Sequence, residues 1–561
     1  MRIIAPKKSF GLRIHETKSR LRQLNRLKSF YCLLIIILIA SIHIIIRSYS
    51  STGPFMGKDE STTIFPAINV ARNIYYGNGS LKYIYHQIFG AQFFRQGLQI
   101  GIASFFYIVI EFLHIPFTEL ILRLPACFAG WICTISVGLL AWIISGRKAG
   151  VFAALMYILV PNTILNHCII RANNTFTPVV QVLSVFSIIC YAKSLHKRWI
   201  WIFWFLVAYQ VGDDNGFFVS FILYAIFIIS VWKIENNIAC KGYLHAIIKY
   251  LFHPGILMVL IIIVLRWGLL SNNFNSEFFQ IIVDKCKEGV SLGFKRIIIA
   301  NLQILGYVIG IAVMISPFVF IFKKTTVQSK WAFLLIIWIF IFEFPVFILN
   351  SYEHLPLTPL LYIAAPAAVI ITLLLSILKL NKYIYVAIFI VLAIIPAALQ
   401  HRDLIDTVIN EKHSTTVCSI RAQGYIFRQL LKKGVSPEKI LFPFEAAFVY
   451  TGDFYIGVWE PTIGKSYFFN ENAEICFVPQ NLLKRKVMGK YLSEAIDDFI
   501  ENNELKSVYR ILDAEGKTSC KIYSSKELFP KEVIGEEKKL ANLFIDEYAD
   551  LRGLAFTRKL K

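Results

Sequence analysis

Long apolar segments alternate with short polar or basic turns from about residue 30 to residue 400. Segments of this length cross the hydrocarbon layer of a bilayer as helices, because a helix pairs its own backbone polar groups there. The pattern predicts eleven transmembrane helices, over residues 30–48, 120–145, 149–169, 176–194, 198–213, 216–233, 249–268, 297–321, 331–349, 356–378 and 383–400. We therefore expect a polytopic α-helical membrane protein.

A twelfth apolar run, GLQIGIASFFYIVIEFL at residues 97–113, decides the orientation of everything after it. If this run does not cross the membrane, the basic turns between later spans share a side with residues 1–29, which carry nine Lys or Arg and one Glu. Cytoplasmic loops retain basic residues, so this arrangement is favoured. We predict an interfacial or re-entrant helix carrying Glu111 within a large outer loop 49–119, a cytoplasmic N-terminus and an outer C-terminus.

The pattern changes after residue 400. Residues 401–561 carry 24 Lys or Arg and 23 Asp or Glu, and they mix helix-like runs (RAQGYIFRQLLKKG, YLSEAIDDFIENN) with strand-like ones (KILFPF, KSVYRIL, KTSCKIYSS). A tail of this length can bury a core of its own. We predict an extracytoplasmic α/β domain over 401–561, following a transmembrane domain over 30–400.

Composition and charge agree with this assignment. The chain is 56 % hydrophobic, its mean hydropathy is +0.59, and its net charge is +22. Nearly all of that charge lies within residues 1–400, where basic loops meet anionic lipid headgroups, so nucleic acid is not an expected partner. The ten cysteines include no CxxC pair. In an oxidising compartment, Cys418, Cys476 and Cys520 could supply one disulfide.

Two adjacent carboxylates stand just beyond the first predicted span. Asp59 and Glu60 precede a helical pattern of Ile64, Ile68 and Ala71, so they lie near the N-terminus of that helix, where its dipole favours their ionised forms. Helix capping by a solvated acid would explain such a pair. Its place in an outer loop beside the bilayer favours a functional role.

Three arginines are predicted at the outer ends of spans, namely Arg123, Arg171 and Arg266. Single interfacial arginines are common, because the long side chain reaches the headgroup layer. Three on the outer side run against the basic-inside bias and indicate that an anion is held there. Glu343 lies within a predicted span and should face a cavity or a cation. His354 stands at the outer end of the next span.

The order of these motifs resembles that of the GT-C glycosyltransferases, in particular protein O-mannosyltransferases, lipid A aminoarabinose transferases and their bacterial relatives. The resemblance covers about residues 30 to 400 and is carried by KDESTTIFPAINVARNIYYGNG, LRLPACFAGWICTISVGLLAWIISGRKAGVFAALMYILVP and IIRANN. It implies transfer of a sugar from a polyprenyl-phosphate carrier to an acceptor on the outer face of the membrane.

The matching positions imply roles for individual residues. Asp59 corresponds to the catalytic loop carboxylate, Glu60 to its neighbour, and Arg123 to the arginine that opens the second span. The chain departs from the family pattern in three places, with Arg171-Ala172-Asn173-Asn174, Gly212-Asp213-Asp214-Asn215-Gly216 and Arg95-Gln96-Gly97. These departures leave the sugar donor and any metal ion open.

The chemistry of the residues points to the same class. A lipid phosphate leaves as a stable anion, so cationic donors around it suffice, whereas the acceptor needs a base or a metal-bound orienting carboxylate. We assign Asp59 and Glu60 to the acceptor, and Arg123, Arg171 and Arg266 to the donor phosphate. The further candidates for the substrate pocket are His354, Glu343, Asn173, Asp213 and Asp214. The sequence establishes no cofactor, and a divalent metal ion held by Asp59 is an open alternative.

The prediction is an inverting hexosyl or pentosyl transferase of a bacterial inner (plasma) membrane. Its partners would be a polyprenyl-phosphate-linked sugar, the lipid bilayer, and a glycan, lipid or protein acceptor of the cell envelope. A transporter or flippase of a lipid-linked substrate is the alternative, although the related halves typical of transporters are not evident. A scaffold without catalytic activity is a third reading, and it should tolerate loss of Asp59.

Overall fold

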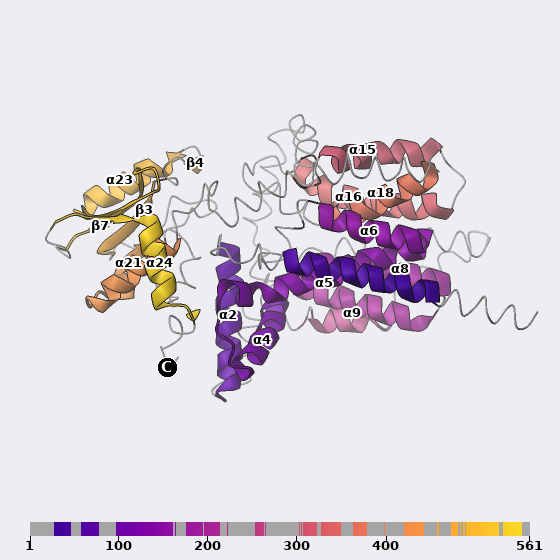
Figure 1. Cartoon of the computed structure of the whole chain (residues 1–561), viewed down its shortest axis with the longest axis horizontal. Helices are drawn as coiled ribbons and strands as arrows, with labels where there is room; N and C mark the ends of the chain where they lie inside the picture. The colour runs from indigo at the N-terminus through magenta and orange to yellow at the C-terminus, as the bar shows by residue number, and fades with distance from the viewer. Residues whose placement is uncertain are drawn as a thin grey trace, which may run out of the picture.

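The structure is a computed structural model. It describes residues 27–46, 58–77, 97–160, 175–194, 196–213, 253–262, 307–322, 327–348, 363–378, 420–442, 473–480, 490–526 and 531–551, together with residues 163, 222, 264, 302, 305, 398, 457–458, 483 and 486–487. The described residues form a helical bundle, a crossing pair of helices and a C-terminal α/β domain (Figure 1).

The bundle is built from helices that run side by side (Figure 1). They are an N-terminal helix Leu27–Ile46, α5 Glu119–Ser145, α6 Arg147–Leu159, α8 Thr177–Ser194, α9 Lys197–Asp213, α15 Tyr307–Phe322, α16 Val327–Ile348 and α18 Ala364–Leu378. Two of the described helices, the N-terminal helix and α5, are long and apolar enough to cross a membrane, and several others are shorter apolar helices. Of the predicted spans 216–233 and 383–400 only residues 222 and 398 are described, so the number eleven stays a prediction.

Helices α5 and α6 form an antiparallel hairpin that turns at Gly146, whose φ of +98° suits glycine. The two helices approach closely because Gly138 faces Gly150. A Cβ built on Gly150 would lie 2.7 Å from the Gly138 carbonyl oxygen. Helix α6 ends at Leu159, short of the predicted 169, because Pro161 disfavours helical backbone at the residue before it.

Helices α2 (Lys58–Tyr75) and α4 (Gly97–Phe112) pack against each other and run steeply across the bundle helices (Figure 1). Their shared core contains Ile64, Ala67, Ile68, Ala71, Ile100, Ala103, Tyr107 and Ile110. The opposite side of α4 exposes Phe105, Val109 and Phe112. The apolar run 97–113 therefore forms a helix, and its interfacial or re-entrant place in the membrane stays a prediction.

The C-terminal domain has a six-stranded mixed sheet with the order β2-β1-β3-β7-β6-β8. The strands are β1 Ile440–Phe442, β2 Gly457–Val458, β3 Ile475–Pro479, β6 Lys506–Leu512, β7 Thr518–Ser524 and β8 Val533–Glu536, with a separate hairpin of β4 Lys486–Val487 and β5 Lys490–Tyr491. Antiparallel pairs β3–β7 and β6–β7 form the centre, and the outer pairs are parallel. Helices α21 (Ile420–Lys432) and α24 (Glu537–Glu547) share a core with one face, and α23 (Leu492–Asn502) with the other.

This sheet corrects one expectation about disulfides. Cys476 on β3 packs in the core beneath α23, whereas Cys520 on β7 packs beneath α21. Cys476 stands opposite Tyr523, and Cys520 opposite Pro479, so the two thiols point to opposite faces of the sheet. Both are free, and burial raises the pKa of the Cys476 thiol. A disulfide between these two residues is excluded, and Cys418 lies outside the described residues.

Candidate functional site

The acidic pair lies where the sequence predicted, in the first turn of a helix. Helix α2 begins at Lys58, so Asp59 and Glu60 occupy its N-terminal turn, where only their backbone is described. The first N–H groups of a helix have no partner within the helix, so this turn favours negative charge. One turn later, Thr63 and Ile64 are fully buried. The backbone that carries the two carboxylates therefore enters directly into the packed core of the α2–α4 pair.

Arg123 lies in the second turn of α5 and is completely buried. Thr118 caps this helix, because its hydroxyl oxygen accepts a hydrogen bond from the Ile121 N–H at 3.3 Å. An arginine keeps its charge under all ordinary conditions, and a charge taken out of water requires compensating partners. Complete burial therefore means that the Arg123 guanidinium needs partners at this end of α5, and its role in holding an anion stays a prediction.

One apolar cluster brings the beginnings of α2 and α5 together. Leu122 and Ala126, which flank Arg123, pack in the same core as Ile64 and Tyr107. The Tyr107 hydroxyl also donates a hydrogen bond to the Leu122 carbonyl oxygen at 2.6 Å. The acidic helix and the buried arginine thus lie at the same end of the bundle, which we call the α2–α4 end (Figure 1).

Glu111 ties the two crossing helices to each other. Its Oε1 lies 3.5 Å from Nε of Arg72, and the side chains are 2 % and 23 % exposed. The guanidinium of Arg72 also lies over the Tyr76 ring, 5.6 Å from its centroid. The carboxylate that the sequence placed on an interfacial helix is therefore one half of a structural ion pair.

The C-terminal domain contacts the same end of the bundle through the turn that precedes α5. Nε and Nη2 of Arg421 lie 2.9 Å and 2.8 Å from Oε1 of Glu119. The Phe117 N–H donates to Oδ1 of Asp550 at 3.1 Å, and the Leu551 N–H donates to the Phe117 carbonyl oxygen at 2.9 Å. Sequence reasoning did not find this junction, which joins residues more than 300 positions apart.

A buried histidine inside the N-terminal helix was also missed. His43 is 1 % exposed, and its Nδ1 lies 2.7 Å from Oγ1 of Thr134 on α5. The Thr134 hydroxyl donates its single proton to the Gly130 carbonyl oxygen at 2.8 Å, so Nδ1 of His43 must be the donor. A histidine within an apolar span was the available signal, because ionisable residues there are rare.

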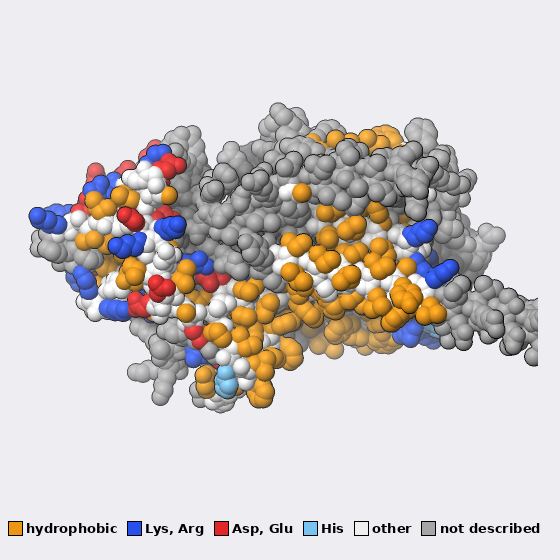
Figure 2. All heavy atoms as spheres, in the orientation of Figure 1, with side chains coloured by type: hydrophobic (Ala, Val, Ile, Leu, Met, Phe, Trp, Pro, Cys, Tyr) orange, Lys and Arg blue, Asp and Glu red, His pale blue; other side chains and the backbone are white. Residues whose placement is uncertain are grey.

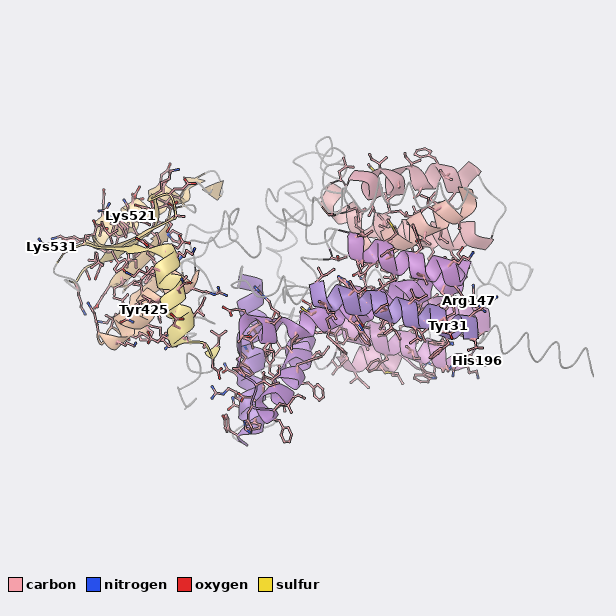
Figure 3. All side chains as sticks on the ribbon, in the orientation of Figure 1. Tyr31, Arg147, His196, Tyr425, Lys521 and Lys531 are labelled. Atoms are coloured by element: carbon pink, nitrogen blue, oxygen red, sulfur yellow. The ribbon has the colours of Figure 1, made fainter. Side chains whose placement is uncertain are left out.

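The opposite end of the bundle is basic. Arg147 and Lys148 begin α6, Lys193 lies in the last turn of α8, and Lys197 and Arg198 begin α9. Figure 2 shows Lys and Arg side chains at this end of a broad apolar surface, and Figure 3 places Arg147 and His196 there. We call these five cations the basic end. Lys193 donates to the Ile143 carbonyl oxygen, and Arg198 lies over the Trp199 ring.

The remaining candidates are placed in part or not at all. Glu343 lies on α16 and Asp213 is the last residue of α9, and only their backbone is described. The structure does not describe Arg171, Asn173, Asp214, Arg266 or His354. Within the described residues, no group of three or more His, Cys, Asp or Glu side chains could hold a metal ion.

No protein-family model and no curated protein match this sequence. Among solved structures, the chain is similar to ArnT from Cupriavidus metallidurans bound to undecaprenyl phosphate, with a TM-score of 0.52 and 11 % identity over 88 % of this chain and 98 % of ArnT. It is also similar to the Archaeoglobus fulgidus oligosaccharyltransferase in complex with zinc and sulfate, with a TM-score of 0.53 and 12 % identity over 88 % of this chain and 73 % of the archaeal one. Both are GT-C proteins, so the resemblance seen in the motifs is confirmed for the fold.

Proposed function

Since the chain has the GT-C fold of these membrane proteins, we propose that it is a membrane glycosyltransferase that uses a polyprenyl-phosphate-linked sugar. The observation that carries the proposal is the position of fully buried Arg123 at the same end of the bundle as the first turn of α2. The undecaprenyl phosphate in the ArnT structure supports this class of carrier.

The donor side of the site requires cations. When the sugar is transferred, the bond between its anomeric carbon and the carrier phosphate oxygen breaks, and the electron pair stays on the phosphate. Arg123 would stabilise that charge in a site from which water is excluded. Arg171 and Arg266 are proposed to complete the cationic group.

The acceptor side requires a base. Asp59 would take the proton of the acceptor hydroxyl or amine as this group attacks the anomeric carbon, and Glu60 would orient the acceptor. A single displacement of this kind inverts the anomeric carbon. A divalent ion held by Asp59 is the alternative, and the zinc in the archaeal crystal structure is compatible with it.

The rest of the pocket and the orientation are also proposals. We assign contacts with the sugar or acceptor to His354, Glu343, Asn173, Asp213 and Asp214. The basic end would face the cytoplasm, so the α2–α4 end and the C-terminal domain would lie outside a bacterial inner membrane. The acceptor would be a glycan, lipid or protein of the cell envelope, and the sugar a hexose or pentose.

The proposal is tested with the substitution Asp59→Asn. Membranes that contain the variant should transfer label from a polyprenyl-phosphate sugar about 10²- to 10⁴-fold more slowly, because the base is lost. Asp498→Asn on the exposed side of α23 is the matched control and should transfer at the wild-type rate. Equal expression of both variants would show that the loss is chemical, and full activity of Asp59→Asn would reject the base.

The same assay separates the enzyme from a transporter or flippase. A flippase moves the labelled carrier to the other leaflet and leaves the bond between sugar and phosphate intact. Covalent label on a new acceptor, dependent on this protein, therefore excludes the transporter, whereas movement of intact carrier without transfer would replace the proposed function.

A further inference from the structure

The junction between the C-terminal domain and the bundle consists of Phe117, Glu119, Arg421, Asp550 and Leu551. It combines one ion pair with two hydrogen bonds to the Phe117 backbone, one from the Leu551 N–H and one to the Asp550 carboxylate. Because Phe117 uses both its N–H and its carbonyl oxygen, the backbone of this turn is fixed in direction as well as in position.

The ion pair in the junction is more enclosed than other ion pairs of the domain. Arg421 and Glu119 are each 15 % exposed, whereas Arg510 and Glu532 on the sheet are 37 % and 29 % exposed. Two guanidinium nitrogens approach one carboxylate oxygen, and charge-assisted hydrogen bonds shielded from water are stronger than exposed ones. The junction is therefore a specific attachment and not a loose surface contact.

Apolar packing extends the junction into the core of the α2–α4 pair. Phe544 of α24 is 1 % exposed, Leu551 is 4 % exposed, and both belong to the cluster that contains Ile64 and Leu122. Tyr425, labelled on α21 in Figure 3, packs against the same cluster. The C-terminal domain thus shares a core with the helices that carry the proposed catalytic residues.

A proline lies near the start of α5. Pro125 has no N–H, so the Ile121 carbonyl oxygen loses its helical hydrogen bond and the first turns are joined less firmly to the rest of the helix. Glu119 and Arg123 are four positions apart, on the same face of α5. A contact that fixes Glu119 therefore also restrains the turn of backbone that carries Arg123.

We propose that the C-terminal domain positions the donor site, with Arg421 and Asp550 as positioning residues that act on Arg123 through the first turn of α5. The inference rests on the proposed function for the role of Arg123. It predicts that weakening the junction lowers the affinity for the carrier phosphate, while turnover with saturating donor stays close to that of the wild type.

The test uses the purified full-length protein in detergent and undecaprenyl phosphate as the probe. Arg421→Gln should raise the Kd about tenfold, a typical coupling between two sites. Arg421→Lys should retain part of the affinity, and the double variant Glu119→Arg with Arg421→Glu should recover most of it. Arg510→Gln, which breaks an Arg–Glu pair away from the junction, should bind like the wild type.

Each result decides between defined alternatives. Arg421→Gln with wild-type affinity, or a charge-reversed pair no better than Arg421→Gln alone, would overturn the positioning role. If Arg421→Gln does not fold, Asp550→Ala provides the same test at the other contact. Arg123→Gln separates the two proposals. If this variant binds undecaprenyl phosphate like the wild type, the proposed donor site is wrong. If Arg123→Gln and Arg421→Gln both bind it more weakly, both proposals are supported.

Discussion

The two ends of the bundle use the same residue types in opposite ways. At the basic end, Lys148, Lys197 and Arg198 are exposed, and no ion pair with a carboxylate is formed by the five cations within the described part of the chain. At the α2–α4 end, Arg72 and Arg421 each meet a glutamate, and Arg123 is fully buried.

This difference separates two tasks of positive charge in a membrane protein. Exposed cations next to an apolar surface fit anionic lipid headgroups and set orientation, and each can be replaced at little cost. Buried cations are costly to desolvate, so they remain only where geometry supplies partners or a ligand. A count of Lys and Arg predicts the first task, whereas the second depends on which side chains the fold encloses.

The largest expected effect concerns the sides of the membrane on which the two ends lie. A cysteine at Glu515, in the exposed hairpin between β6 and β7, should react with an impermeant thiol reagent added to intact cells. A cysteine at Lys197 should react only after the cells are permeabilised, because the bilayer separates the two positions. Reversed accessibility would overturn the orientation of the whole chain.

The second effect compares the thermal stability of the purified protein after loss of an Arg–Glu ion pair and after loss of an exposed arginine. Glu111→Gln leaves Arg72 partly buried beside a neutral group and should lower stability by about 2 kcal/mol, below the usual range for a buried pair because Arg72 is 23 % exposed. Arg198→Gln at the basic end should leave the midpoint unchanged. Equal midpoints for both variants would show that the ion pair contributes nothing to the α2–α4 packing.

The smallest effect is a dependence of stability on pH in the C-terminal domain. Hydrogen bonds from Lys439 and Lys526, at 2.5 Å and 2.6 Å, hold the pKa of Glu474 below its ordinary value. The folded-state pKa lies below the unfolded one, so the stabilisation is complete above about pH 4.5 and is lost as the pH falls through the folded value.

Glu474→Gln should therefore remove this acid dependence and cost about 0.5 kcal/mol at pH 7, because both lysines are half exposed. Acid titration of the domain's unfolding, followed by intrinsic fluorescence, measures it. An unchanged acid midpoint in the variant would assign the acid sensitivity to other carboxylates.

Much of the fold could be predicted because its signals are local. The strand-like run KSVYRIL coincides with β6 Lys506–Leu512, and the apolar run 120–145 differs from α5 by one residue. The fully buried strand β3 was missed, because a short apolar run without alternation does not distinguish a central strand from other buried structure. Helix α24, with few buried apolar positions, was missed as well.

The candidate site, too, could be predicted only where its signals are local. Two local signals were sufficient for part of it. Helix capping predicted the first-turn position of Asp59, and the edge of an apolar run predicted that Arg123 lies near the start of α5. The contact between Arg421 and Glu119 was not predictable, because no periodicity links two residues 302 positions apart. The same holds for His43 and Thr134, which meet only when the N-terminal helix packs against α5.

The glycine contact between α5 and α6 has a mechanical consequence for the membrane part. A methyl group on Gly150 would lie 2.7 Å from one backbone atom and 2.8 Å from Trp142, and Ile36 of the N-terminal helix fills the space over Gly138. The N-terminal helix, α5 and α6 are therefore closely packed at the level of these two glycines. A side chain larger than hydrogen at Gly138 or Gly150 would therefore push α5, α6 and the N-terminal helix apart.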